Sequence, residues 1–123
     1  MTRAALIAGL VAVLLGWPAT PASANPKGGC PLGRICLYIG RGYTGERHDV
    51  GGDQAGPCTP LATPVWSAVN RSGPRAGTPA YLLRLFRDPG CTQPASTVAP
   101  EAARADTAGA RSFVLECRPS AGC

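Results

Sequence analysis

Six cysteines are the residues of this chain whose type and spacing most clearly imply chemistry. They are Cys30, Cys36, Cys58, Cys91, Cys117 and Cys123. Their thiols can either form disulfides or bind a metal ion. Zinc sites commonly have two cysteines separated by about two to four residues, a spacing that does not occur here. We therefore expect disulfides, and six cysteines in 123 residues are typical of a small exported domain.

The other reactive side chains do not form a recognisable catalytic set. His48 is the single histidine, so a Ser–His–Asp or Cys–His arrangement would have to use it, and we expect it on the surface of a short strand. No Gly-x-Ser-x-Gly, His-Glu-x-x-His, phosphate-binding loop or dinucleotide-binding motif occurs. The seven acidic residues are spread along the chain. We predict a protein that is not an enzyme, with no catalytic residues, no cofactor and no bound metal.

The beginning of the chain predicts export. Arg3 precedes an uncharged apolar run, residues 4–15, that is too short to span a bilayer about 30 Å thick. A small-x-small sequence, Ala-Ser-Ala, occupies residues 22–24. We expect residues 1–24 to be a cleaved signal peptide and residues 25–123 to form one secreted domain without stable membrane insertion.

Composition limits the remaining possibilities. The chain is 45% hydrophobic and only 15% charged, which is not the composition of a disordered tail. Its net charge is +5, but the basic residues are scattered, so we expect a solubilising surface and no nucleic-acid partner. We expect a monomer.

Short apolar segments separated by turn residues predict an all-β domain. The chain contains 16 Gly and 13 Pro, which suit frequent turns. The segments expected to form strands are Ile35–Ile39, Glu46–Val50, Val65–Asn70, Tyr81–Phe86 and Ser112–Cys117. We expect the Ala-rich segment 101–110 to be a loop or a single turn, because Thr107 and Gly109 disfavour a helix.

An internal repeat organises these strands. Its copies are Leu37-Tyr38-x4-Tyr43-x-Gly45 and Leu85-Phe86-x4-Cys91-x-Gln93, each followed later by a serine, Ser67 and Ser112. We expect the aromatic residue to pack on the turn, glycine to allow a positive φ there, and the serine hydroxyl to bind the turn backbone. Two such units predict a pair of Greek keys that share a buried apolar face.

The pattern Tyr38-x4-Tyr43-x-Gly45 resembles the βγ-crystallin Greek-key signature. Residues 30–38, Cys-Pro-Leu-Gly-Arg-Ile-Cys-Leu-Tyr, are similar to the start of peptidase inhibitor family I36, which comprises secreted bacterial proteins. Residues 65–70 and 84–91 are similar to later blocks of that family. The resemblance covers most of residues 30–117. It implies a disulfide-stapled βγ-crystallin-like sandwich and inhibition of an extracellular metalloprotease.

The resemblance also implies a disulfide between Cys30 and Cys36, which flank a Pro-Leu-Gly turn. The other four cysteines allow three pairings. Cys117–Cys123 is locally plausible and would leave Cys58–Cys91, and the alternative is a Cys91–Cys117 bridge.

An inhibitor of this kind needs a rigid exposed loop. The candidate consists of Arg87, Asp88, Pro89, Gly90, Cys91, Thr92 and Gln93. We expect Pro89 to brace it and Cys91 to anchor it in an extended shape that enters a protease cleft. Such a loop loses little entropy when it binds. Inhibitory relatives can close this loop with a short disulfide of its own, whereas here it contains one cysteine.

Calcium is the other ligand that a crystallin-like fold brings into question. Relatives that bind calcium carry paired Asp or Asn shortly before the conserved serine. Residues 62–65 before Ser67 and residues 107–110 before Ser112 contain no carboxylate. Because Ca²⁺ prefers several oxygen ligands, carboxylates among them, we expect no high-affinity site.

Two other functions stay open on the sequence. One is binding to a cell-wall or envelope polymer through basic and exposed aromatic side chains, for which the candidates are Arg71, Arg75, Arg84, Arg87, Trp66 and Tyr81. The other is a purely structural or antimicrobial secreted module.

Overall fold

The computed structural model describes residues 27–118, so the expected signal peptide and Cys123 lie outside the described residues. The strands of this part are β1 (Ile35–Gly40), β2 (Thr44–Val50), β3 (Thr59–Val65), β4 (Ser67–Asn70), β5 (Tyr81–Phe86), β6 (Pro94–Val98), β7 (Ala103–Arg104) and β8 (Ala110–Cys117). Its helical elements are three single 3-10 turns, η2 (Lys27–Gly29), η3 (Gly52–Gln54) and η4 (Pro74–Ala76). Between residues 27 and 118 there is no helix with the length and apolar character needed to cross a membrane.

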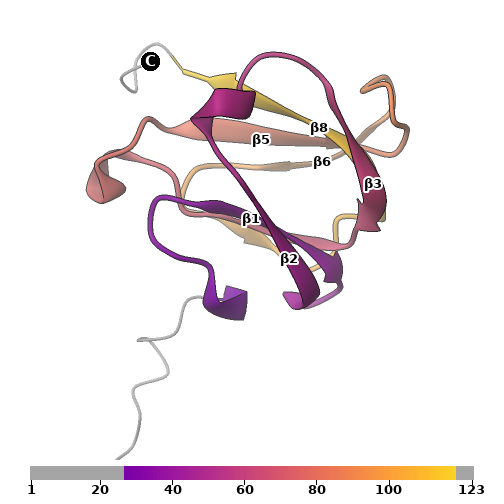
Figure 1. The fold of residues 1–123 in the computed structure, drawn as a ribbon, viewed down its shortest axis with the longest axis horizontal. Coiled ribbons are helices and arrows are strands. Elements are labelled where there is room, and N and C mark those ends of the chain that lie inside the picture. The colour runs from indigo at the N-terminus through magenta and orange to yellow at the C-terminus, as the bar shows by residue number, and fades with distance from the viewer. Residues whose placement is uncertain (1–26, 119–123) are drawn as a thin grey trace, which may run out of the picture.

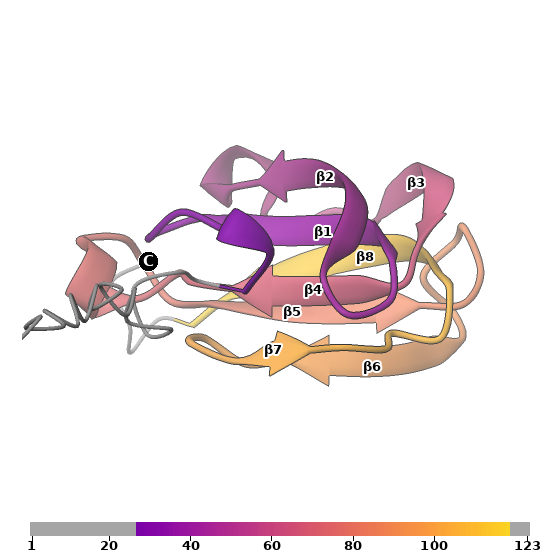
Figure 2. The same cartoon turned by 90° about the horizontal axis from the view of Figure 1, so that it is seen from below.

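The strands form two antiparallel four-stranded sheets, which confirms the predicted all-β class. The first sheet has the order β2-β1-β4-β7 and the second the order β3-β8-β5-β6. Figure 1 shows the sheets as two layers, with β1 and β2 in one and β5, β6 and β8 in the other. Figure 2 shows the strands of the first sheet following one another from β2 to β7.

Each half of the chain contributes one strand to the sheet of the other half. The strand β3 belongs to the first half but pairs with β8 in the second sheet. The short strand β7 belongs to the second half but pairs with β4 in the first sheet. The two sheets are therefore interlinked by the chain as well as by packing.

The main apolar core fills the space between the sheets. Alternate residues along β1, β5 and β8 point into it, as the two-residue period of a strand requires. Its largest buried members are Ile35, Leu37, Leu83, Leu85, Phe113 and Leu115. Burial of each such side chain contributes roughly 1.5–3 kcal/mol to stability, so this layer holds the two sheets together.

The prediction of one strand over Val65–Asn70 is wrong. Val65 ends β3 in the second sheet and Ser67 begins β4 in the first, with Trp66 between them. The Trp66 N–H donates to the Tyr38 carbonyl at 2.8 Å, and the Trp66 carbonyl accepts from the Thr107 N–H at 2.9 Å. The chain passes from one sheet to the other here, and an apolar run carries no sign of such a step.

Two strands were not predicted from the sequence because their composition is not typical of strands. The strand β3 contains Pro60 and Pro64, and β6 begins at Pro94. Both lie at edges of the second sheet, where a missing N–H does not interrupt the ladder. The segment 101–110 is a loop, as predicted, apart from the two residues of β7 and Ala110, which begins β8.

The predicted repeat has the same hydrogen bonds in both halves. The Ser67 hydroxyl donates to the Gly40 carbonyl at 2.6 Å and accepts from the Tyr43 N–H at 2.9 Å. The Ser112 hydroxyl donates to the Asp88 carbonyl at 2.5 Å and accepts from the Cys91 N–H at 3.2 Å. Each serine thus closes the hairpin turn of its own half.

The expected role of glycine in these turns is correct for one half only. The first turn has a positive φ at Gly42 and at Gly45, where a Cβ would lie 2.8 Å from the Ile39 side chain. In the second turn Gly90 has no positive φ, and the left-handed residue is Cys91, with φ 56°. Tyr43 is left-handed at the matching position, with φ 64°. The repeat preserves the backbone shape at this position rather than the residue type.

The aromatic members of the repeat differ in burial. Tyr38 is buried, and its ring packs edge-on against Tyr43 with the centroids 6.2 Å apart. Phe86, at the corresponding position opposite Ser112, is half-buried. Packing of the aromatic residue on the turn is therefore seen in the first half.

Candidate functional site

Disulfides fix both exposed segments that the sequence singled out. Cys30 is bonded to Cys36 with Cα atoms 5.9 Å apart, as the resemblance implied, and Cys58 is bonded to Cys91 with Cα atoms 6.0 Å apart. The second bond excludes the alternative Cys91–Cys117 bridge. Cys117 is disulfide-bonded as well. Its expected partner Cys123 lies outside the described residues.

The loop of residues 87–93 joins β5 to β6 and is closed by backbone and side-chain hydrogen bonds. The Arg87 N–H donates to the Gln93 carbonyl at 2.8 Å across its base. Inside the loop, the Asp88 carboxylate accepts from the Thr92 hydroxyl at 2.6 Å and from the N–H groups of Thr92 and Gln93 at 3.0 and 2.8 Å. The loop is consequently a compact turn folded around one carboxylate.

These hydrogen bonds keep Asp88 ionised over nearly the whole pH range. The Thr92 hydroxyl, followed by the Gln93 N–H, stabilises the charged carboxylate and lowers the pKa of Asp88 from 3.8 to about 2. The negative charge that organises the loop is thus retained well into the acidic range.

The expectation of an extended loop is wrong, although the expected anchor at Cys91 is present. Cys91 is tied to Cys58 by the disulfide, and its left-handed backbone turns the chain back toward β6. An extended conformation would separate Asp88 from Thr92 and break their hydrogen bonds. What the loop exposes at its tip is Pro89 and Gly90.

The second exposed segment is the ring closed by the Cys30–Cys36 disulfide. The Arg34 N–H donates to the Pro31 carbonyl at 3.2 Å, which forms a tight turn with Leu32 and Gly33 at its tip. Gly33 has a φ of 85°, a conformation that favours glycine at this place in a turn. Two further bonds, from the Gly33 N–H to the Arg71 carbonyl and from the Arg71 N–H to the Arg34 carbonyl, fasten the tip to the chain after β4.

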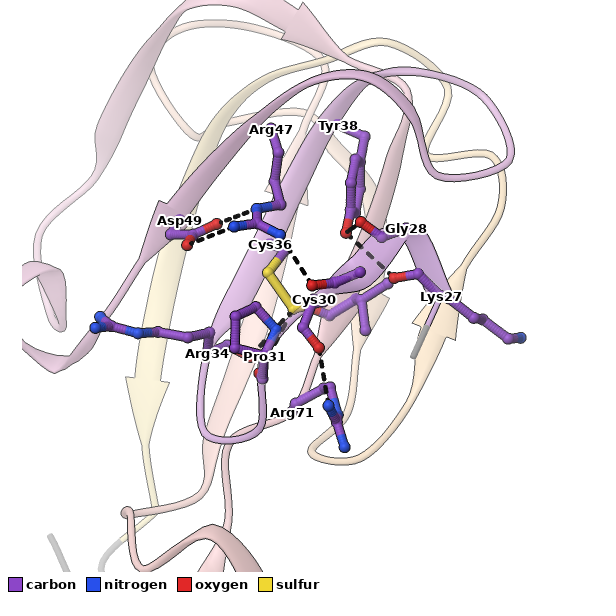
Figure 3. A network of polar contacts seen from close by, with 12 residues as sticks. Lys27, Gly28, Cys30, Pro31, Arg34, Cys36, Tyr38, Arg47, Asp49 and Arg71 are labelled. Atoms are coloured by element: carbon purple, nitrogen blue, oxygen red, sulfur yellow. Dashed lines mark hydrogen bonds and ion pairs between the residues drawn. A yellow bond between two sulfur atoms is a disulfide. The ribbon is translucent and has the colours of Figure 1, made fainter. Parts of the chain in front are cut away.

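A network of polar contacts attaches this ring and η2 to the outer face of the first sheet (Figure 3). The guanidinium of Arg47 donates to the Gly29 carbonyl at 3.0 Å and pairs with Asp49 at 2.8 Å. The guanidinium of Arg71 donates to the Cys30 carbonyl at 2.8 Å. The Tyr38 hydroxyl donates to carbonyls of η2 at 3.0 and 3.2 Å, and burial raises the pKa of this phenol, which keeps it a donor.

Beneath this network lies a second apolar cluster, separate from the main core. It consists of Cys30, Cys36, Tyr38 and Val69. Its disulfide and its ring therefore rest on a packed surface instead of projecting freely. The ring is as firmly placed as the strand that carries it.

The structure does not gather the predicted polymer-binding residues into one surface. Arg71 and Arg75 line a cleft of about 610 Å³, which neither Arg84 nor Arg87 lines. Arg84 is paired with Glu116 at 2.7 Å. These arginines are therefore distributed over separate parts of the described surface.

The two aromatic candidates for polymer binding are not exposed. Trp66 is half-buried, with the guanidinium of Arg41 lying 4.2 Å from its ring centroid. Tyr81 is half-buried against the main core. Neither ring is a free platform for a ligand.

Metal ligands and a catalytic histidine are not brought together. His48 lies on the edge strand β2, half exposed, with Nε2 3.6 Å from a Glu46 carboxylate oxygen. Among residues 27–118 no group of three or more His, Cys, Asp or Glu could hold a metal ion. Asp106, the carboxylate next to residues 107–110, pairs with Arg41 at 3.1 Å.

Leu32 is the residue that the sequence analysis overlooked. The sequence places it in a turn between two cysteines, and the structure leaves the residue 59% exposed at the tip of the ring. Its position between closely spaced cysteines was the available signal.

No family model matches this chain, and no curated protein or solved structure matches the chain significantly.

Proposed function

We propose that this protein is a secreted peptidase inhibitor that blocks an extracellular protease, with metalloproteases as the first class to test. In this proposal residues 1–24 direct export, and the two sheets are a βγ-crystallin-like pair of Greek keys. The exchange of β3 and β7 between the sheets supports that fold, as does the repeated bonding of Ser67 and Ser112. The proposed inhibitory activity rests on the resemblance of residues 30–117 to peptidase inhibitor family I36.

The observation that carries the proposal is that two exposed turns are each held by a disulfide and by internal hydrogen bonds. One is the ring of residues 30–36, and the other is the loop of residues 87–93. A rigid convex segment binds a protease cleft with little loss of conformational entropy. If its backbone were cut, the fixed ends would stay in place and favour rejoining or slow release. Both properties suit an inhibitor that acts by shape.

An inhibition panel tests the proposal. The oxidised domain, residues 25–123, is titrated against secreted metalloproteases and serine proteases, and the inhibition constant is measured for each. We expect inhibition of at least one protease and its loss after reduction and alkylation of the cysteines. Activity of every protease unchanged at micromolar oxidised protein would refute the proposal.

A second candidate function, binding to an anionic wall polymer, rests on one observation. Lys27, Arg71 and Arg75 line the same cleft, and Glu101 is the one carboxylate that the described part of the chain places in its lining. Binding of this kind is electrostatic and weakens with salt. Sedimentation with purified anionic wall polymer at low and high ionic strength would detect it, and retention that does not depend on salt would exclude it.

A further inference from the structure

Leu32 is the one large apolar side chain that residues 27–118 leave mostly exposed, at 59%. Single apolar residues on a surface are common and need no explanation by themselves. Leu32 differs from such residues because its backbone is held on every side. The Cys30–Cys36 disulfide closes the ring, and three backbone hydrogen bonds fix the turn at its tip.

The tip of the ring is also supported beside Leu32, at Gly33. A Cβ at Gly33 would lie 3.3 Å from the Thr78 methyl group and 3.4 Å from the Ala76 side chain, so the tip already rests against the segment around η4. The backbone around Leu32 is already ordered in the free protein, so binding requires no further loss of its conformational entropy. An apolar group displayed in this way binds without a large entropic penalty.

The surroundings of Leu32 are basic. Leu32 stands between two clefts of about 610 and 390 Å³ and lines both of them. The cations that line these clefts are Lys27, Arg34, Arg71 and Arg75. Among the described residues that line the two clefts, Glu101 is the only carboxylate, and it lies 3.7 Å from Arg75. A partner that covers Leu32 would therefore meet a positive rim.

The ring and the loop of residues 87–93 lie at opposite ends of β5. Tyr81 at the start of this strand lines a cleft beside Leu32, whereas the loop follows Phe86 at its end. Figures 1 and 2 both show the segment before β1 and the β5–β6 connection on opposite sides of the sandwich. One protease cleft cannot readily engage both, so the two segments are alternative contact sites.

We infer that Leu32 is the primary anchor of the protein, entering an apolar specificity pocket of a protease whose cleft has an acidic rim. This inference rests on the proposed inhibitory function and assigns it to the ring rather than to residues 87–93. Leucine fills the pocket, the flanking arginines face the acidic rim, and the disulfide keeps the ring in shape. The loop at the other end of β5 remains outside the complex.

The test uses a protease that the oxidised wild-type protein inhibits. The variants are Leu32→Ala and Leu32→Asp, with Leu32→Met as the conservative control and Pro89→Ala as the matched control at the tip of the opposite loop. We expect Leu32→Ala to raise the inhibition constant roughly tenfold or more and Leu32→Asp to raise it further. Leu32→Met keeps an apolar side chain of similar size and should inhibit better than Leu32→Ala, and Pro89→Ala should not show the loss seen in Leu32→Ala. Thermal unfolding of all four should be nearly unchanged, because neither side chain belongs to the core.

The outcomes separate the two claims. A wild-type protein that inhibits while Leu32→Asp inhibits equally well overturns the assignment of Leu32 and leaves the inhibitory function standing. Weaker inhibition by Pro89→Ala with no effect at Leu32 moves the contact to residues 87–93. A wild-type protein that inhibits no protease overturns the proposed function and this inference with it.

Discussion

The hydroxyl of Thr92 donates to the carboxylate of Asp88 at 2.6 Å, and this contact determines the shape of the β5–β6 loop. The same carboxylate also accepts backbone N–H groups of Thr92 and Gln93. One ionised side chain therefore accepts N–H groups that would otherwise need backbone carbonyls as partners. The loop is rigid because of its charge as well as its disulfide.

Removal of this carboxylate should loosen the loop without unfolding the domain. In Asp88→Ala the amide hydrogens of Thr92 and Gln93 lose their acceptor, so we expect both to exchange with solvent faster. Hydrogen exchange followed by NMR measures the change. The control is Asp53→Ala, an exposed aspartate in η3. Equal protection of these amides in wild type and Asp88→Ala would contradict the role given to the carboxylate.

The titration of Asp88 should reveal the same interaction. The folded pKa of about 2 lies below the ordinary value of 3.8, so the stabilising effect is complete above 3.8 and is lost as the pH falls toward 2. An NMR titration of the Asp88 carboxyl should show its midpoint near 2. In Thr92→Val the largest cause of the shift is removed, and the midpoint should rise toward 3.8. An identical midpoint in both proteins would show that the hydroxyl is not the cause.

The two buried serines should have similar importance for stability. Ser67→Ala and Ser112→Ala each leave a carbonyl and an N–H of a turn without a partner, and we expect each to lower the free energy of unfolding by about 1–3 kcal/mol. Urea unfolding measures this.

A third serine is the matched control for that comparison. The Ser96 hydroxyl is buried without a hydrogen-bond partner among the described residues. Ser96→Ala should therefore be neutral or slightly stabilising. If Ser96→Ala lowered the free energy of unfolding as much as Ser67→Ala, the hydrogen bonds would not explain the destabilisation.

The two described disulfides should differ in their contributions. Replacement of each pair by serine should lower the free energy of unfolding by roughly 2–4 kcal/mol, with the larger loss for Cys58–Cys91 because that bond closes a loop of 33 residues and Cys30–Cys36 one of 6. Denaturant unfolding of the two double variants gives the comparison. Peptide mapping of the oxidised wild type checks the pairing, and six free thiols would refute it.

The sequence predicted the apolar strands and the features that repeat. Short apolar runs between turn residues located β1, β5 and β8, and the repeat from Tyr38 to Ser67 located a turn that the serine closes. It did not locate the step between sheets at Trp66, because no change of residue type marks it. The proline-containing edge strands were missed because they follow the composition of loops.

Less of the candidate site than of the fold could be predicted from the sequence. Its cysteines were visible, but the compact shape of residues 87–93 depends on where the Asp88 side chain points. The exposure of Leu32 depends on contacts with Arg71 and Thr78, which are distant in the sequence. The pairing of Arg41 with Asp106 is equally distant. Such contacts arise only once the two halves are assembled.

The exchange of β3 and β7 determines what a single proteolytic cut would do to the fold. A single cut in the connection between β4 and β5 would yield two fragments, each with a strand still inserted in a sheet of the other. Cys58 lies on one fragment and Cys91 on the other, so a covalent tether would join them. A nicked molecule would stay assembled, and its surface turns would keep their shape.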